Sequence, residues 1–183
     1  RKSQKAGSGP HTVLPIVVPQ SEAEPDRRGQ IHLISSVARC VEELVDFGRY
    51  RWTELPAGAV QVYCIDDYFG QVINGGHSQY VANRIHRREE SGRDLRPGID
   101  PIETLRLKDH VNHAVECAAA IGSPAHVGIL RDLQQWLADN PKLAERQTGF
   151  QGGRASELEI LDHRFHTLQK TDPLEPRLAA WIS

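Results

Sequence analysis

Methionine is absent from this chain of 183 residues, and position 1 is an arginine. We therefore expect the natural chain to begin upstream of Arg1. Long hydrophobic runs are absent as well, because no apolar stretch approaches the roughly 20 residues that a membrane-spanning helix requires. This absence predicts a protein that does not associate with a membrane through a spanning segment.

Cysteine is scarce, and its spacing argues against a disulfide framework or a cysteine-ligated metal. The three cysteines are Cys40, Cys64 and Cys117, an odd number without any Cys-x-x-Cys pair. Each lies within an apolar helical pattern. This pattern predicts reduced, buried thiols and a cytoplasmic location.

Several enzyme motifs are also missing. The chain has no phosphate-binding Gly-Lys-Ser/Thr loop, no Gly-x-Ser-x-Gly elbow and no dinucleotide fingerprint after a strand. The Gly-rich segment 149–153 lacks both an adjacent lysine and a preceding strand. We therefore expect no catalytic residues of these classes and no cofactor, and the sequence favours a protein that is not an enzyme.

The chain has no strong excess of charge of either sign, since its formal net charge is -2. Residues 1–29 carry a net charge of +2 and residues 30–183 a net charge of -4. A domain this mildly acidic lacks the basic field typical of nucleic-acid-binding proteins. We do not expect direct nucleic-acid binding.

The chain divides into two parts by composition. Residues 1–29 contain four prolines among Gly, Ser and Gln, which predicts an extended or disordered arm. Residues 30–183 show apolar side chains at three- and four-residue spacing and no convincing strand pattern. They predict one mainly α domain, a helical array of about six or seven helices.

Punctuating residues divide this domain into its expected helices. The first begins near Ile31, a second ends at 74–76, a short one covers 78–85, and 87–100 forms a loop. The next begins near Pro101 and ends at Gly122. Ser123 caps a helix that ends at Asn140, Ser156 caps another, and a short helix with Trp181 closes the chain. We expect Trp136 and Trp181 to lie in the core.

One corner of the sequence is dense in amide and phenol side chains. It contains Asn74, Gly75, Gly76, Gln79, Tyr80 and Asn83. Gln79 and Asn83 share a helical face, and the glycines permit a sharp turn. Either these amides lock a helix–helix corner by satisfying its backbone groups, or they form a polar patch that binds a partner.

The pattern Asn-Gly-Gly-x-x-Gln-Tyr-x-x-Asn resembles the signature of a bacterial domain family of unknown function that includes a dimeric DNA-mimic protein. Segments 113–122 and 158–166 resemble two further parts of that family, which would make 57–183 a core similar to its C-terminal domain. His77 stands where the family usually has a bulky apolar residue. The resemblance implies a protein partner such as a transcription factor or a toxin, and the possibility of a homodimer.

Two segments share the pattern Asp-His-x-x-His and suggest an alternative. Histidines three apart lie on one side of a helix, and neutral imidazole is a good zinc ligand. Two such helices could supply His110, His113, His163 and His166 to a metal. The other interpretation places His110 and His163 on the polar sides of their helices.

The sequence therefore leads to two hypotheses of different classes. The first is a non-enzymatic protein-interaction module, of an inhibitor, immunity or DNA-mimic type. The alternative is a metal-binding protein or metal-dependent hydrolase that uses the four histidines.

Overall fold

The computed structural model describes residues 15–22, 24, 32–46, 50–90, 105–149 and 155–182. Within these residues the chain is mainly α, as predicted, with seven α-helices and no strand. The elements are η1 (Gln20–Glu22), α1 (Leu33–Asp46), η2 (Trp52–Glu54), α2 (Ala57–Glu90), α3 (Leu107–Ala120), α4 (Pro124–Asp139), α5 (Pro141–Ala144), α6 (Ser156–Thr171) and α7 (Leu174–Ile182).

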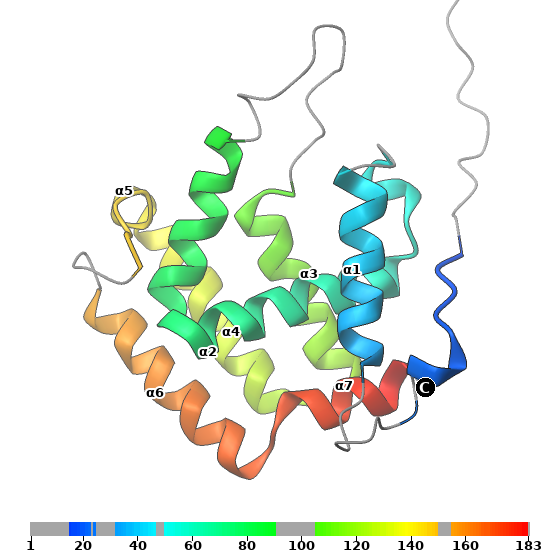
Figure 1. Cartoon of the computed structure of the whole chain (residues 1–183). Helices are drawn as coiled ribbons and strands as arrows, with labels where there is room; N and C mark the ends of the chain where they lie inside the picture. Colours follow the sequence, from blue (N-terminus) through cyan, green and yellow to red (C-terminus); the bar gives the residue numbers. More distant parts are fainter. Residues whose placement is uncertain are drawn as a thin grey trace, which may run out of the picture.

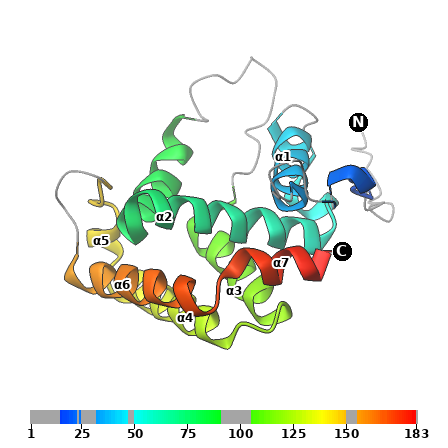
Figure 2. The ribbon, with the colours of Figure 1, turned by 60° about the horizontal axis from the view of Figure 1, so that its bottom comes forward.

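Helix α2 is the centre of the array (Figure 1). It packs against α1, α3 and α6, while α4 packs against both α3 and α6, and α7 packs against α1. Turning the molecule shows α6 and α7 following one another along the same side of α2 (Figure 2). Residues far apart in the sequence therefore meet around α2.

Helix α2 is bent where the sequence predicts a corner. Its helical geometry breaks at Gly76, which has φ 78° and ψ 179°. The two halves run in different directions in Figure 1, and the second half continues to Glu90. The prediction of a loop from residue 87 was therefore wrong for residues 87–90. Residues 91–104 lie outside the described part.

Large apolar and aromatic side chains fill the core between these helices. The fully buried ones include Tyr68, Tyr80, Leu130, Leu133 and Phe165. Trp136 belongs to this core, as predicted, with 6% of its surface exposed. Trp181 does not, because 40% of it is exposed at the end of the last helix.

The helix boundaries follow the predicted punctuation, but two of the predicted caps do not form. Ser123 precedes α4 without a side-chain capping bond, because its hydroxyl pairs with His126 instead. Ser156 is the first residue of α6, and Ala155 occupies the cap position. Helix α3 begins at Leu107, later than the predicted start near Pro101.

The predicted arm is described only in part, since residues 1–14, 23 and 25–31 lie outside the described ranges. Within 15–22, Ile16 and Val18 pack against the core while Val17 is exposed, an alternation typical of extended chain. The Ser36 hydroxyl donates to a carboxylate oxygen of Glu22 at 2.9 Å. The division into an arm and a domain stays a prediction.

The cysteines are free thiols, of which Cys64 and Cys117 are buried and Cys40 is half-buried. Burial raises the pKa of the Cys64 thiol well above its usual value, although Arg84 acts in the opposite direction. Burial also raises the pKa of Cys117 to about 12. None of the described helices is long and apolar enough to cross a membrane.

Candidate functional site

The two glycines of the corner are required for different reasons. Gly76 adopts a backbone conformation that is essentially restricted to glycine, and a β-carbon there would overlap the carboxylate of Asp162 on α6. Gly75 is helical, but a β-carbon there would overlap the side chain of Gln79. Gly76 therefore makes room for a neighbouring helix, and Gly75 makes room for a side chain of α2 itself.

Asp162 joins the bend of α2 to α6. Its Oδ1 accepts hydrogen bonds from the His77 backbone N–H and from the His77 ring at Nδ1, both at 2.6 Å. The other ring nitrogen, Nε2, lies 2.9 Å from the Tyr68 hydroxyl. Asp162, His77 and Tyr68 thus form one hydrogen-bonded network, which we call the α6 network.

Burial and hydrogen bonding together determine the charges in the α6 network. Burial would raise the pKa of Asp162, but the hydrogen bonds from His77 outweigh it and lower this pKa. Burial lowers the pKa of His77 despite the nearby carboxylate. A neutral His77 that donates from Nδ1 and accepts the Tyr68 proton at Nε2 fits both directions.

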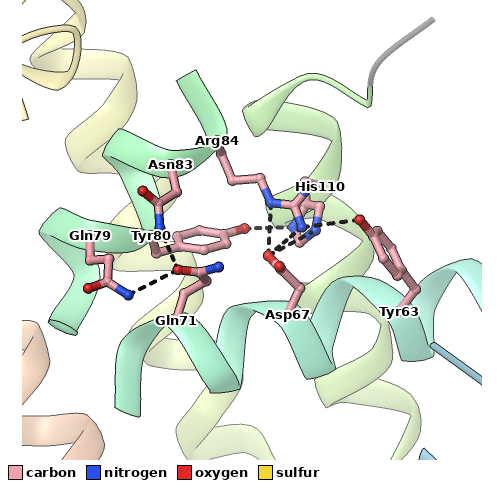
Figure 3. Close-up of polar contacts among 8 residues, drawn as sticks. All are labelled: Tyr63, Asp67, Gln71, Gln79, Tyr80, Asn83, Arg84 and His110. Carbon is pink, nitrogen blue, oxygen red and sulfur yellow. Dashed lines mark hydrogen bonds and ion pairs between the residues drawn. The ribbon is translucent and has the colours of Figure 1, made fainter. Parts of the chain in front are cut away.

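A second network, which adds an arginine to the same three residue types, joins both halves of α2 to α3 (Figure 3). The Tyr80 hydroxyl lies 2.7 Å from His110 Nδ1, and His110 Nε2 lies 3.6 Å from an oxygen of Asp67. Arg84 donates from Nε to the same oxygen at 2.8 Å. We call Tyr80, His110, Asp67 and Arg84 the α3 network.

Arg84 is held on several sides. Besides Asp67, it donates to the Tyr63 hydroxyl at 3.3 Å and lies over the Tyr63 ring, 5.5 Å from its centroid. Only 7% of its side chain is exposed. Burial would lower its pKa, but Asp67 and Tyr63 outweigh that effect and raise it, so the guanidinium remains charged.

The α6 network and the α3 network meet at their tyrosines. The rings of Tyr68 and Tyr80 pack edge to face with centroids 5.2 Å apart, and both side chains are fully buried. Phe165 closes this centre from α6, with its ring perpendicular to Tyr68 at 5.7 Å. The bend of α2 is therefore anchored to α6 on one side and to α3 on the other.

The amides of the corner form a third group. Gln71 Oε1 accepts from Gln79 Nε2 at 3.1 Å and from Asn83 Nδ2 at 2.7 Å, which links the two halves of α2 (Figure 3). Asn83 is exposed and Gln79 is buried. Asn74 is exposed, and its side chain makes no hydrogen bond to another described residue.

Further polar contacts hold the surroundings of the corner. The Ser78 hydroxyl donates to Gln147 Oε1 at 2.9 Å, and a β-carbon on Gly149 would lie only 3.4 Å from the Cα of Gln79. The segment after α5 is thereby fixed to the second half of α2. The corner residues thus contact several parts of the fold.

A third buried histidine lies between α4 and α6. His126 Nδ1 lies 2.6 Å from the Ser123 hydroxyl, and Nε2 lies 2.7 Å from the Gln169 side-chain amide. The side-chain oxygen Oε1 of Gln169 accepts a hydrogen bond from the backbone N–H of Leu174, the first residue of α7. Burial lowers the pKa of His126 to about 4.

The four histidines predicted to bind a metal are not brought together. His110 is buried against Tyr80, contrary to its predicted polar position, and His113 pairs with Glu116 on the surface. His163 and His166 are exposed on α6. No group of three or more potential metal ligands occurs among the described residues, so the metal hypothesis has no support.

Sequence reasoning identified the corner but missed most of its partners. His77 and Asp162 both lie in segments that the sequence singles out, but their pairing was not predicted. The usable signal was His77 itself, because a polar ring in place of an expected apolar residue requires a buried partner. Its partner Asp162 is 85 residues away, a separation that no local pattern reports.

The geometry of the α6 network and the α3 network suits a structural role. Both ring nitrogens of His77 are engaged within the protein, and the ring has no exposed surface. Tyr68 and Tyr80 are equally enclosed, and burial raises the pKa of each phenol. Groups enclosed in this way hold helices together rather than exchange protons with a substrate.

Comparison with known proteins bears on this same part of the chain. Residues 53–98 match the family model described as DMP19-like protein. The match covers about a quarter of the 183 residues, and no curated protein and no solved structure matches the chain. The matched segment contains the bend of α2 with Tyr63, Tyr68 and Tyr80. The chain is therefore similar to DMP19-like proteins across the bent helix on which the site is built.

Proposed function

We propose that this chain is a non-enzymatic protein-interaction module related to the DNA-mimic class. The observation that carries the proposal is the DMP19-like match at 53–98, which falls on the bent helix. The buried ionisable groups of the α6 and α3 networks form hydrogen bonds and ion pairs that hold that bend. The bend in turn fixes the directions of the two halves of α2 and the surfaces that they present.

Exposed residues near the bend supply the surface that we assign to a partner. Ile73 is 43% exposed, and Asn74 and Asn83 are also exposed. An exposed apolar side chain next to the Asn74 amide, which can donate and accept hydrogen bonds, supports the assignment of a contact with a protein. Asn74, Gly75, Gly76, Gln79, Tyr80 and Asn83 then have two roles: the exposed amides contact the partner, and the buried members keep the bend.

The partner is a protein rather than a nucleic acid in this proposal. The exposed charges of the described helices include both signs, such as Glu43 and Asp46 on α1 and Arg131 on α4. Such a surface differs from a continuous array of carboxylates spaced like phosphates. The narrower hypothesis, occupancy of the DNA site of a transcription factor, therefore depends on complementarity of shape as well as charge.

Site-specific cross-linking tests the proposal. A photoreactive amino acid at Ile73 should cross-link the purified chain to one protein in an extract of the source organism. The same group at Arg131, exposed on α4, is the matched control and should not. A duplex DNA competitor should reduce the cross-link if the partner is a DNA-binding protein. Equal cross-linking from both positions, or none from Ile73, would contradict the assigned surface.

A further inference from the structure

The side chain of Asn74 belongs to neither the α6 network nor the α3 network. It is exposed, makes no hydrogen bond to another described residue, and precedes Gly75. We propose that Asn74 is a site of spontaneous deamidation and isoaspartate formation, and that this modification releases the bend of α2. The proposal is independent of the proposed function.

The chemistry needs only these two residues and water. The backbone nitrogen of Gly75 attacks Cγ of Asn74, so a C–N bond forms, the Cγ–Nδ2 bond breaks and ammonia leaves with the proton from Gly75. Water then opens the five-membered succinimide. Attack at Cγ gives aspartate, and attack at the main-chain carbonyl carbon gives isoaspartate, in which the backbone runs through the side chain.

The position of Asn74 in α2 makes this attack accessible. A helix normally resists the reaction, because its hydrogen bonds hold the following N–H away from Cγ. Here the helical geometry breaks at Gly76, and the N–H of His77 donates to Asp162 on α6. Asn74 thus lies in the last turn before the break, where helices fray most readily. Gly75 has no side chain to obstruct the attacking nitrogen.

The other three asparagines of the chain provide internal controls. The Asn83 amide donates to Gln71 and precedes an arginine, and the Asn112 oxygen accepts from Gln134 in the middle of α3. Asn140 precedes Pro141, whose nitrogen has no proton to lose. Asn74 alone of the four combines a following glycine with a side chain unbound among the described residues.

Modification would act directly on the corner. Isoaspartate adds one backbone carbon between positions 74 and 75, which displaces Gly75 from Gln79 and Gly76 from Asp162. Either product also adds a carboxylate near the C-terminal end of the first half of α2, where a negative charge is disfavoured. The expected result is weaker attachment of α2 to α6.

Peptide mapping of the aged protein tests the proposal. The full chain is incubated folded, and in parallel in denaturant, in mildly alkaline buffer, and isoaspartate is measured at each asparagine by mass spectrometry and enzymatic methylation. In the folded sample, conversion should be faster at Asn74 than at Asn83, Asn112 and Asn140. The melting temperature should fall as the product accumulates. The Asn74→Gln variant, whose longer side chain disfavours ring closure, should keep its melting temperature during the same incubation.

Two results would overturn the proposal. One is an unmodified Asn74 in the folded chain after the denatured chain has been converted at the same position, since the fold would then protect it. The other is conversion at Asn74 with no change in melting temperature, which would separate the chemistry from the bend. The Asn74→Asp variant distinguishes the products, because it carries the new charge without the additional backbone carbon. It should melt above the isoaspartate form.

Discussion

The carboxylate of Asp162 occupies the space that a β-carbon on Gly76 would require. Asp162 also accepts two hydrogen bonds from the following residue, His77. The absence of a side chain at one position and the charge at the other therefore form a single contact between α2 and α6.

Replacement of Gly76 by alanine should destabilise the protein. The backbone conformation is strained for any other residue, which costs of the order of 1–3 kcal/mol, and overlap with Asp162 adds to that cost. The measurement is the free energy of unfolding in urea. Gly70→Ala is the control in the same helix, because a β-carbon there meets no atom within 4 Å. It should stabilise the helix by roughly 0.5–1 kcal/mol. Equal effects of the two changes would contradict the role of the bend.

Asp162→Asn should weaken the attachment of α6, because hydrogen bonds to a charged acceptor contribute about 1.5–3 kcal/mol. Since the folded state lowers the pKa of Asp162, its contribution is present above the unfolded pKa of roughly 3.9 and is lost as the pH falls through the folded pKa. The difference between parent and variant in urea titrations should therefore shrink on acidification below about pH 4.

A matched control for Asp162 lies on the surface. Asp132 pairs with Arg164 at 2.6 Å, but both side chains are about half exposed. Asp132→Asn should change stability by less than about 1 kcal/mol at neutral pH. A loss as large as that of Asp162→Asn would show that the hydrogen bonds to His77 are not the cause.

Asp66→Asn should stabilise the protein above neutral pH. Burial, Asp67 and Glu175 together raise the pKa of Asp66 to about 6. A raised carboxyl pKa means that the stability present below the unfolded pKa of roughly 3.9 is lost as the pH rises through about 6. The variant should have a higher melting temperature than the parent at pH 8 and little advantage at pH 4. An advantage independent of pH would contradict this assignment.

His126→Gln should alter the acid side of the stability profile. The pKa of His126 falls to about 4 because the ring is buried, so the folded state holds it neutral. Its contribution is present above the unfolded pKa of roughly 6.5 and is lost as the pH falls towards 4. The variant should be less stable than the parent at pH 7, and this difference should narrow between pH 6.5 and 4. His163→Gln, on an exposed ring, is the control and should leave the profile unchanged.

The helical architecture could be predicted from the sequence because its signals are local. Apolar spacing identified α1, the two halves of α2, α3, α4, α6 and α7, and the glycine pair marked the bend. Continuation of α2 to residue 90 was missed because the charged residues after Ile85 resemble a loop. The exposure of Trp181 was missed because helical spacing does not report which face of α7 meets another helix.

The site was less accessible to sequence reasoning. One interpretation placed His110 on the polar side of its helix because it lies beside the predicted apolar stripe, yet Tyr80 and Asp67 approach it from another helix. The metal hypothesis failed for the same reason, since spacing along one helix says nothing about which face meets a second helix. Contacts between α2 and α6 depend on packing, which no local pattern encodes.

The two enclosed tyrosines have a consequence in alkaline solution. Burial raises the pKa values of Tyr68 and Tyr80, so neither phenol can lose its proton while the centre remains closed. The unfolded chain would release both protons near pH 10, and stability should therefore fall steeply as the pH rises above 10. A spectrophotometric titration should show these two phenolates forming together with unfolding, so the ultraviolet absorbance of tyrosinate would report directly on the opening of the bend.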